Sequence, residues 1–84
     1  MASEAKKDTI RIIDNGQPKV VGSTNVTFEE AVELAYPTPP VENPIYSVTY
    51  RNAVEPREGT LAPGGSVIVR EEGTIFNVRV AGRS

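Results

Sequence analysis

The N-terminal part of the chain alternates hydrophobic and polar positions with a period of two. Ile10 and Ile12 alternate with Arg11 in a β-branched run, and this pattern predicts a strand. The Asn-Gly pair at residues 15–16 is the strongest short signal for a β-hairpin turn. We therefore expect residues 18–21 to return as a second strand, with the proline tolerated at its start.

The pattern then changes to a helical period. After a predicted turn at residues 22–26, Thr27 and Glu30 fit a capping box, in which the threonine accepts a hydrogen bond from a free backbone N–H. Pro37 predicts that the helix ends near Tyr36. The apolar stripe of this helix has the spacing i, i+3, i+4 and i+7, at Phe28, Ala31, Val32 and Ala35.

A proline-rich segment follows the helix. Four prolines between residues 37 and 44 predict an extended crossing loop. Residues 45–51 then return to a period of two and predict a strand. Its apolar face consists of Tyr46, Val48 and Tyr50.

Two further strands are expected near the C-terminus, at residues 66–70 and 74–80. The Pro-Gly pair at residues 63–64 suits the centre of a type II turn. A tight turn at residues 71–73 separates the two strands. In the last strand the alternating apolar positions are Phe76, Val78 and Val80.

The element order is therefore ββαβββ or, if residues 60–61 pair briefly, ββαββ with an extra short piece. A helix packed across one face of a mixed sheet after an opening hairpin is the β-grasp arrangement, an α+β fold. We expect one domain at residues 9–80. A disordered N-terminal segment at residues 1–8 precedes it, and a flexible C-terminal tail at residues 81–84 follows it.

Composition narrows the classes of function. The 84 residues suffice for one domain, and the net charge of −2 argues against a nucleic-acid or membrane partner, since either needs a basic face. The absence of cysteine and histidine excludes disulfides and a thiol nucleophile, and it removes the commonest general base and metal ligand. We therefore expect no enzyme, no catalytic residue, no metal site and no cofactor. We expect a cytoplasmic monomer.

The end of the chain resembles a known family. The glycine at residue 73, the Phe-Asn-Val strand at residues 76–78 and the short basic, small-residue tail resemble the bacterial ubiquitin-like proteins often found as tandem multiubiquitin domains. Residues 46–50 and 59–69 are also similar to that family. The resemblance covers roughly residues 9–84 and implies a ubiquitin-like β-grasp fold.

The resemblance also implies a protein modifier. Its C-terminal carboxylate would be activated as an adenylate by an activating enzyme and passed to a conjugating enzyme, ending on a target amine or hydroxyl. A deconjugating protease is a further candidate partner, and such bacterial systems are typically associated with defence against phage. The alternative is a non-covalent β-grasp interaction module that uses its sheet face or an edge strand.

The resemblance places the candidate site at the tail and on the sheet. The candidate conjugation tail is Ala81, Gly82, Arg83 and Ser84, which lacks the Gly-Gly ending of ubiquitin. Three explanations stay open: the partner enzyme accepts this ending, the chain is a processed or truncated form, or it is not conjugated. The candidate partner-binding residues are Thr49, Arg79 and Arg83.

Thr49 and Arg79 fall at the outward positions where ubiquitin has its apolar docking patch, and both are polar. The two arginines, Arg79 and Arg83, have two open interpretations. They either contact an activating enzyme or belong to a solvated strand edge and tail.

Overall fold

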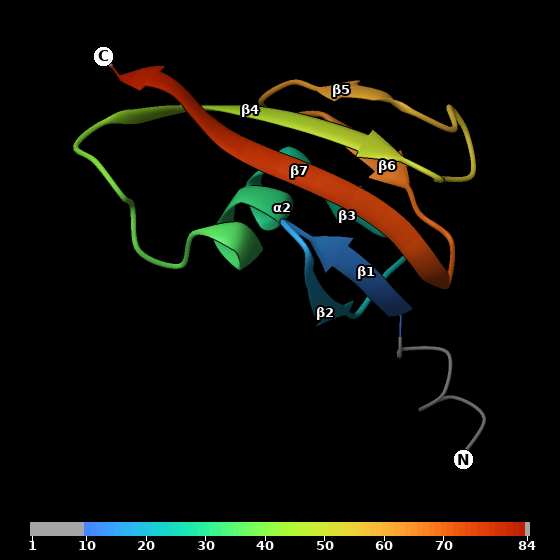
Figure 1. The fold of residues 1–84 in the computed structure, drawn as a ribbon. Coiled ribbons are helices and arrows are strands. Elements are labelled where there is room, and N and C mark those ends of the chain that lie inside the picture. The colour runs from blue at the N-terminus through green and yellow to red at the C-terminus, as the bar shows by residue number, and fades with distance from the viewer. Residues whose placement is uncertain (1–9, 84) are drawn as a thin grey trace.

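A five-stranded mixed sheet with one helix across it forms the body of the protein (Figure 1). The computed structural model describes residues 10–83, with the side chain of Arg83 excepted. The order of the strands in the sheet is β2-β1-β7-β4-β5. Their bounds are Ile10–Asp14 for β1, Gln17–Val21 for β2, Pro44–Arg51 for β4, Gly59–Leu61 for β5 and Glu72–Arg83 for β7.

The first and last strands of the sheet are central neighbours. β1 runs parallel to β7, whereas β1–β2, β4–β7 and β4–β5 are antiparallel pairs. The helix α2, Phe28–Ala35, lies behind the sheet in the view of Figure 1. The predicted α+β, β-grasp fold is confirmed. No helix within residues 10–83 is long and apolar enough to cross a membrane.

The opening hairpin has the predicted turn. Asn15 and Gly16 both have positive φ, 54° and 80°, which a two-residue type I′ turn requires. The Asn15 side chain also joins this hairpin to β7: its Nδ2 donates to the Val78 carbonyl at 2.9 Å, and its Oδ1 accepts from the Val78 N–H at 2.7 Å. The turn therefore holds the two central strands in register.

The helix begins and ends nearly where the sequence predicts. The backbone N–H of Glu30 donates to the Thr27 hydroxyl at 3.0 Å, an N-cap that stabilises a helix by about 1 kcal/mol. The helix ends at Ala35, and the Tyr36 N–H donates to the Val32 carbonyl at 2.8 Å. The predicted stripe faces the core, with Phe28 and Ala31 buried and the other two members half-buried.

The core lies between α2 and the inner face of the sheet. The predicted alternation in β4 and β7 is confirmed, because every second side chain in the middle of each strand is buried. The pair Tyr50 and Phe76 has its ring centroids 6.1 Å apart. Fully buried side chains of the core include Ile12, Val26, Val48, Val69, Phe76 and Val78.

Two short strands form a second sheet that the sequence does not predict. β3, Asn25–Thr27, pairs with β6, Ser66–Ile68. The turn predicted at residues 22–26 is therefore wrong at residues 25 and 26, which belong to β3. A strand at residues 66–70 is correct in part, but it stays outside the main sheet. The brief pairing at residues 60–61 is confirmed as β5.

The last strand is longer than predicted at both ends. The expected turn at residues 71–73 is the entry of β7: the Arg11 N–H donates to the Glu71 carbonyl at 2.9 Å, and Gly73 has a φ of 96° where the register with β1 shifts. At the other end, β7 continues past Val80 to Arg83. The predicted boundary at residue 80 is therefore wrong, because β4 begins at Pro44 and offers partners to the tail.

Two predictions concern residues that lie outside the described ones. One is the prediction of a disordered N-terminal segment at residues 1–8. The other is the assignment of Ser84 to the conjugation tail. The flexibility expected of residues 81–84 stays a prediction.

Candidate interaction site on the outer sheet face and the terminal strand

The outer face of the sheet, which points away from α2, is polar in the middle of its two longest strands. Thr49 on β4 pairs with Asn77 on β7, and Ser47 pairs with Arg79. All four side chains are exposed. The structure thus places Thr49 and Arg79 on one face of neighbouring strands, where one partner surface can contact both.

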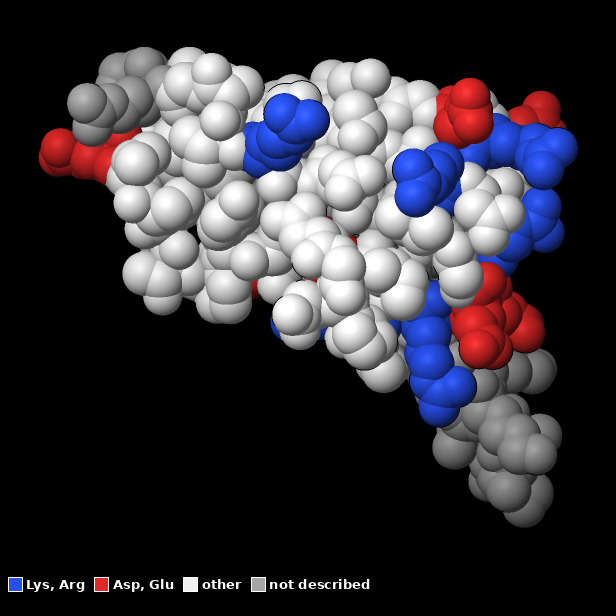
Figure 2. Space-filling model, viewed as in Figure 1, with Lys and Arg blue, Asp and Glu red and all other residues white. Residues whose placement is uncertain are grey.

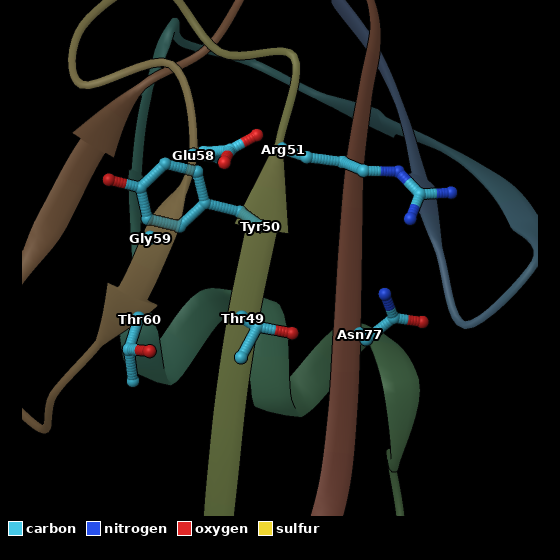
Figure 3. Close-up of a pocket in the computed structure, with 7 residues that line it drawn as sticks. All are labelled: Thr49, Tyr50, Arg51, Glu58, Gly59, Thr60 and Asn77. Atoms are coloured by element: carbon cyan, nitrogen blue, oxygen red, sulfur yellow. The ribbon is translucent and has the colours of Figure 1, made fainter.

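Two shallow hollows lie on this outer face. One, of about 340 Å³, is lined by Thr49, Arg79 and the first residue of the tail, Ala81. The other, of about 430 Å³, lies beside β5 (Figure 3). In Figure 3 the side chain of Arg51 extends across β7, and Glu58 lies at the rim. The lining residues of the second hollow are Thr49, Tyr50, Arg51, Glu58, Gly59, Thr60 and Asn77.

Polar side chains make up most of the lining of these hollows. Hydroxyls, an amide and guanidinium groups line them, and Glu58 is the one carboxylate among the lining residues. In Figure 2 the basic side chains lie mostly toward the right-hand part of the visible face, and acidic ones lie at both ends of the molecule. Within residues 10–83, no group of three or more His, Cys, Asp or Glu side chains could hold a metal ion.

The terminal segment of β7 stays paired with β4 but contains a β-bulge. Tyr46 pairs with Val80 and Ile45 pairs with Gly82, so Ala81 between them has no partner in the register. The backbone of Arg83 pairs with Pro44. Figure 1 shows this end of β7 at the periphery of the molecule.

Gly82 is a glycine that the fold does not require. A Cβ atom built there would meet no atom within 4 Å, and its φ lies outside the left-handed region. Gly64 and Gly65 differ from it: Gly64 has a φ of +84°, and a Cβ on Gly65 would lie 3.0 Å from the Ala62 carbonyl oxygen. Packing and backbone conformation therefore explain the Gly-Gly pair of the turn but not the glycine of the tail.

Two buried polar residues, Asp14 and Thr74, are absent from the sequence-based predictions. The Asp14 side chain is 1% exposed, and neither of its oxygens accepts a hydrogen bond within the described part of the chain. Burial raises the pKa of this carboxyl to about 6, against the opposing attraction of Lys19. A signal was present, because the alternation of Ile10 and Ile12 puts residue 14 on the same inner face.

The fold and this polar face define a class of protein, a small ubiquitin-like domain of the β-grasp type. The multiubiquitin family model matches residues 10–80, most of the chain. The chain belongs to the multiubiquitin family. The predicted resemblance to a ubiquitin-like family is therefore confirmed. Neither the curated proteins nor the solved structures include a match.

Proposed function

We propose that this chain is a ubiquitin-like protein modifier of a bacterial ubiquitination-like pathway, of the kind associated with phage defence. It is activated at the carboxylate of its tail, residues 81–84, and conjugated to target proteins. Membership of the multiubiquitin family and the β-grasp fold support this proposal.

The proposal rests on one observation, the presence of a glycine at position 82 that the fold does not require. Its surroundings are open and its φ is ordinary, so the fold gives no reason for a glycine. A tail that is threaded through a narrow enzyme channel does give one, since a glycine lets other groups approach the backbone closely. We therefore assign Gly82 to the passage of the tail into an activating enzyme.

The chemistry needs an activated carboxyl group. A tail carboxylate oxygen attacks the α-phosphorus of ATP and pyrophosphate leaves, which gives an acyl adenylate. A nucleophile on the conjugating machinery attacks the carbonyl carbon of the adenylate, loses its proton and displaces AMP. A target amine then attacks the same carbon, the enzyme nucleophile leaves with a proton, and the amide bond to the target forms. Because the chain contains no cysteine or histidine, we assign thiol and imidazole chemistry to the partner enzymes.

The outer sheet face is the proposed contact surface for these enzymes. Thr49 and Arg79 line one hollow on this face together with Ala81, the first residue of the tail. Arg83 is the third proposed contact. An activating enzyme, a conjugating enzyme and a deconjugating protease would each need to hold the domain while the tail occupies the active site.

The experiment uses two glycines with the same open surroundings. A Cβ at Gly22, as at Gly82, meets nothing within 4 Å. Gly82→Val and Gly22→Val should both leave the melting temperature nearly unchanged, but only Gly82→Val should abolish covalent adducts. Adducts are detected by blotting a tagged chain in cells that carry the neighbouring activating and conjugating genes. Deletion of residues 82–84 and Gly82→Pro should abolish them too.

Two results would overturn the modifier proposal. One is that a chain without residues 82–84 still forms covalent adducts. The other is that the intact chain forms no adduct and supports no ATP–pyrophosphate exchange by the activating enzyme encoded beside it. Mass spectrometry of the adducts identifies which residue of the chain is linked to the target.

The second candidate function is a non-covalent interaction module, and one observation favours it. The backbone of Gly82 and Arg83 pairs with β4 instead of extending freely from the domain. Amide hydrogen exchange discriminates between the two candidates. Exchange at Gly82 as slow as at Val78 would favour the module, and fast exchange would favour the modifier.

A further inference from the structure

An apolar groove lies on the side of the molecule that faces away from the outer sheet face. It has a volume of about 480 Å³ and lies between α2, the proline-rich crossing loop and the start of β4. Figure 1 shows how this loop leaves α2 and swings out before it returns to β4. The groove is lined by Phe28, Glu29, Val32, Glu33, Tyr36, Pro37, Pro39, Pro44 and Tyr46.

The apolar lining of this groove is accessible to a partner. Tyr36 and Tyr46 are stacked with ring centroids 5.6 Å apart, and both side chains are half-buried, as is Val32. Pro37 and Pro39 are exposed. Aromatic and proline side chains in a concave surface are typical of sites that take an apolar anchor from a partner protein.

The charge around the groove has one sign. Between Lys19 and Arg51 the chain has no lysine or arginine, but it has four glutamates, Glu29, Glu30, Glu33 and Glu42. Two of these, Glu29 and Glu33, line the groove one helical turn apart and are exposed. The Gly64 N–H donates to Oε2 of Glu29 at 3.0 Å, which holds that carboxylate at the surface. A cationic partner therefore meets attraction from Glu29 and Glu33 at this groove.

Prolines and a helix cap restrict the backbone on both walls of the groove. Four prolines between residues 37 and 44 fix φ in the loop, and Thr27 caps the helix that forms the other wall. A preformed groove loses little conformational entropy on binding, so a small contact area can still give measurable affinity. The lining is thus suited to a short segment rather than to a large flat surface.

We propose that this groove binds a basic segment of a partner protein, which inserts one or two apolar side chains between α2 and the crossing loop. Lysines or arginines of the segment contact Glu29 and Glu33. This docking site goes beyond the proposed conjugation, which requires only the tail and the outer face. It also lies beside the tail, since Pro44 and Tyr46 pair with Arg83 and Val80. One partner can therefore hold the groove and the tail together.

The test uses short synthetic peptides as probes. The first has two leucines among lysines and arginines; the second replaces the basic residues with glutamates, and the third replaces the leucines with serines. Binding is followed by fluorescence anisotropy and by ¹⁵N chemical shifts. We expect the first peptide alone to bind, with a dissociation constant of about 100 μM, typical of a small contact, and to weaken as salt increases.

The variants separate the groove from general electrostatics. Glu33→Lys reverses a charge inside the groove, and Glu58→Lys makes the same change beside the outer face. We expect about tenfold weaker binding of the first peptide to the Glu33→Lys protein and less than twofold change for Glu58→Lys. Because both glutamates are exposed, both variants should keep the melting temperature of the parent protein.

Several outcomes would overturn the proposal. They are shift changes around Thr49 and Arg79 instead of Val32 and Tyr46, equal binding of the acidic and basic peptides, or no binding of the first peptide. Shift changes at the groove that depend on protein concentration without peptide would assign it to a second copy of this chain. None of these outcomes bears on conjugation, which is measured with the tail variants.

Discussion

The two faces of the paired strands β4 and β7 have opposite character, although the same stretch of backbone builds both. On the inner face, Val48 pairs with Val78 and both are buried. At the adjacent register position, Thr49 pairs with Asn77 and both are exposed. The inner face is constrained by packing, whereas the outer face can vary without loss of the fold. The proposed enzyme contacts, Thr49 and Arg79, lie on the outer face, whereas the proposed peptide groove lies on the opposite side of the molecule.

The strongest test of this contrast is at Phe76, on the inner face. Its side chain is fully buried. Truncation of such an aromatic costs about 3–5 kcal/mol, against total stabilities of about 5–15 kcal/mol for small domains. We expect Phe76→Ala to unfold much of the protein, as measured by urea denaturation. Its outer neighbour, Asn77→Ala, serves as the matched control and should change stability by less than about 0.5 kcal/mol.

The second test concerns Asp14, the carboxylate that breaks the apolar character of the inner face. Its folded-state pKa of about 6 lies above the ordinary value of 3.8, so between these pH values the folded protein keeps a proton that the unfolded chain has lost. The free energy of unfolding therefore falls as pH rises through this window, by up to about 3 kcal/mol from this group.

Asp14→Asn removes this titration. The variant and the parent should have about the same free energy of unfolding near pH 4. As the pH rises to 7, the free energy of unfolding of the parent should fall below that of the variant. Denaturant melts across this pH range measure the difference. Glu58→Gln, at an exposed carboxylate, is the control and should show no such divergence. A constant difference between Asp14→Asn and the parent at every pH would mean that residue 14 titrates normally.

The outer face should tolerate substitution. Thr49→Ala and Arg79→Ala are each expected to change the free energy of unfolding by less than about 0.5 kcal/mol, because both side chains are exposed. Thermal denaturation measures this directly. A loss above about 1 kcal/mol at either position would show that the outer face also stabilises the fold, and the contrast between the faces would fail.

The smallest expected effect concerns eukaryotic ubiquitin-binding domains, which should not bind the outer face. The resemblance to ubiquitin predicts that Thr49 and Arg79, both polar and exposed, occupy the positions of its apolar docking patch. We expect no measurable binding of eukaryotic ubiquitin-binding domains at ~100 μM, a concentration that detects weak complexes. Chemical-shift changes clustered at Thr49 and Arg79 on addition of such a domain would contradict this expectation.

Local signals explain which elements could be predicted from the sequence. The type I′ turn at Asn15 and Gly16 and the cap at Thr27 depend on residues a few positions apart, and both are present in the structure. The period-two pattern also gave the correct inner face of β4 and β7. The same pattern places Asp14 on the inner face. The burial of Asp14 is nevertheless not predicted, because a carboxylate is not expected at an apolar position.

The missed features depend on contacts between distant parts of the chain. In β3 the single apolar residue, Val26, lies between two polar ones, and the strand exists because it pairs with β6 about forty residues later. The extension of β7 to Arg83 follows from where β4 begins, because the small residues of the tail have no pattern of their own. The groove beside α2 was also missed, since its lining comes from three separate segments.

The position of β7 in the middle of the sheet has a consequence for synthesis on the ribosome. Chains are made from the N-terminus at about 5–20 residues per second, so β1, α2 and β4 emerge before β7 exists. Until then β1 and β4 have no shared neighbour, and the core lacks Phe76 and Val78. The domain therefore cannot fold while it is being translated. Where such domains follow one another in a single chain, each would fold only after translation of the next has begun.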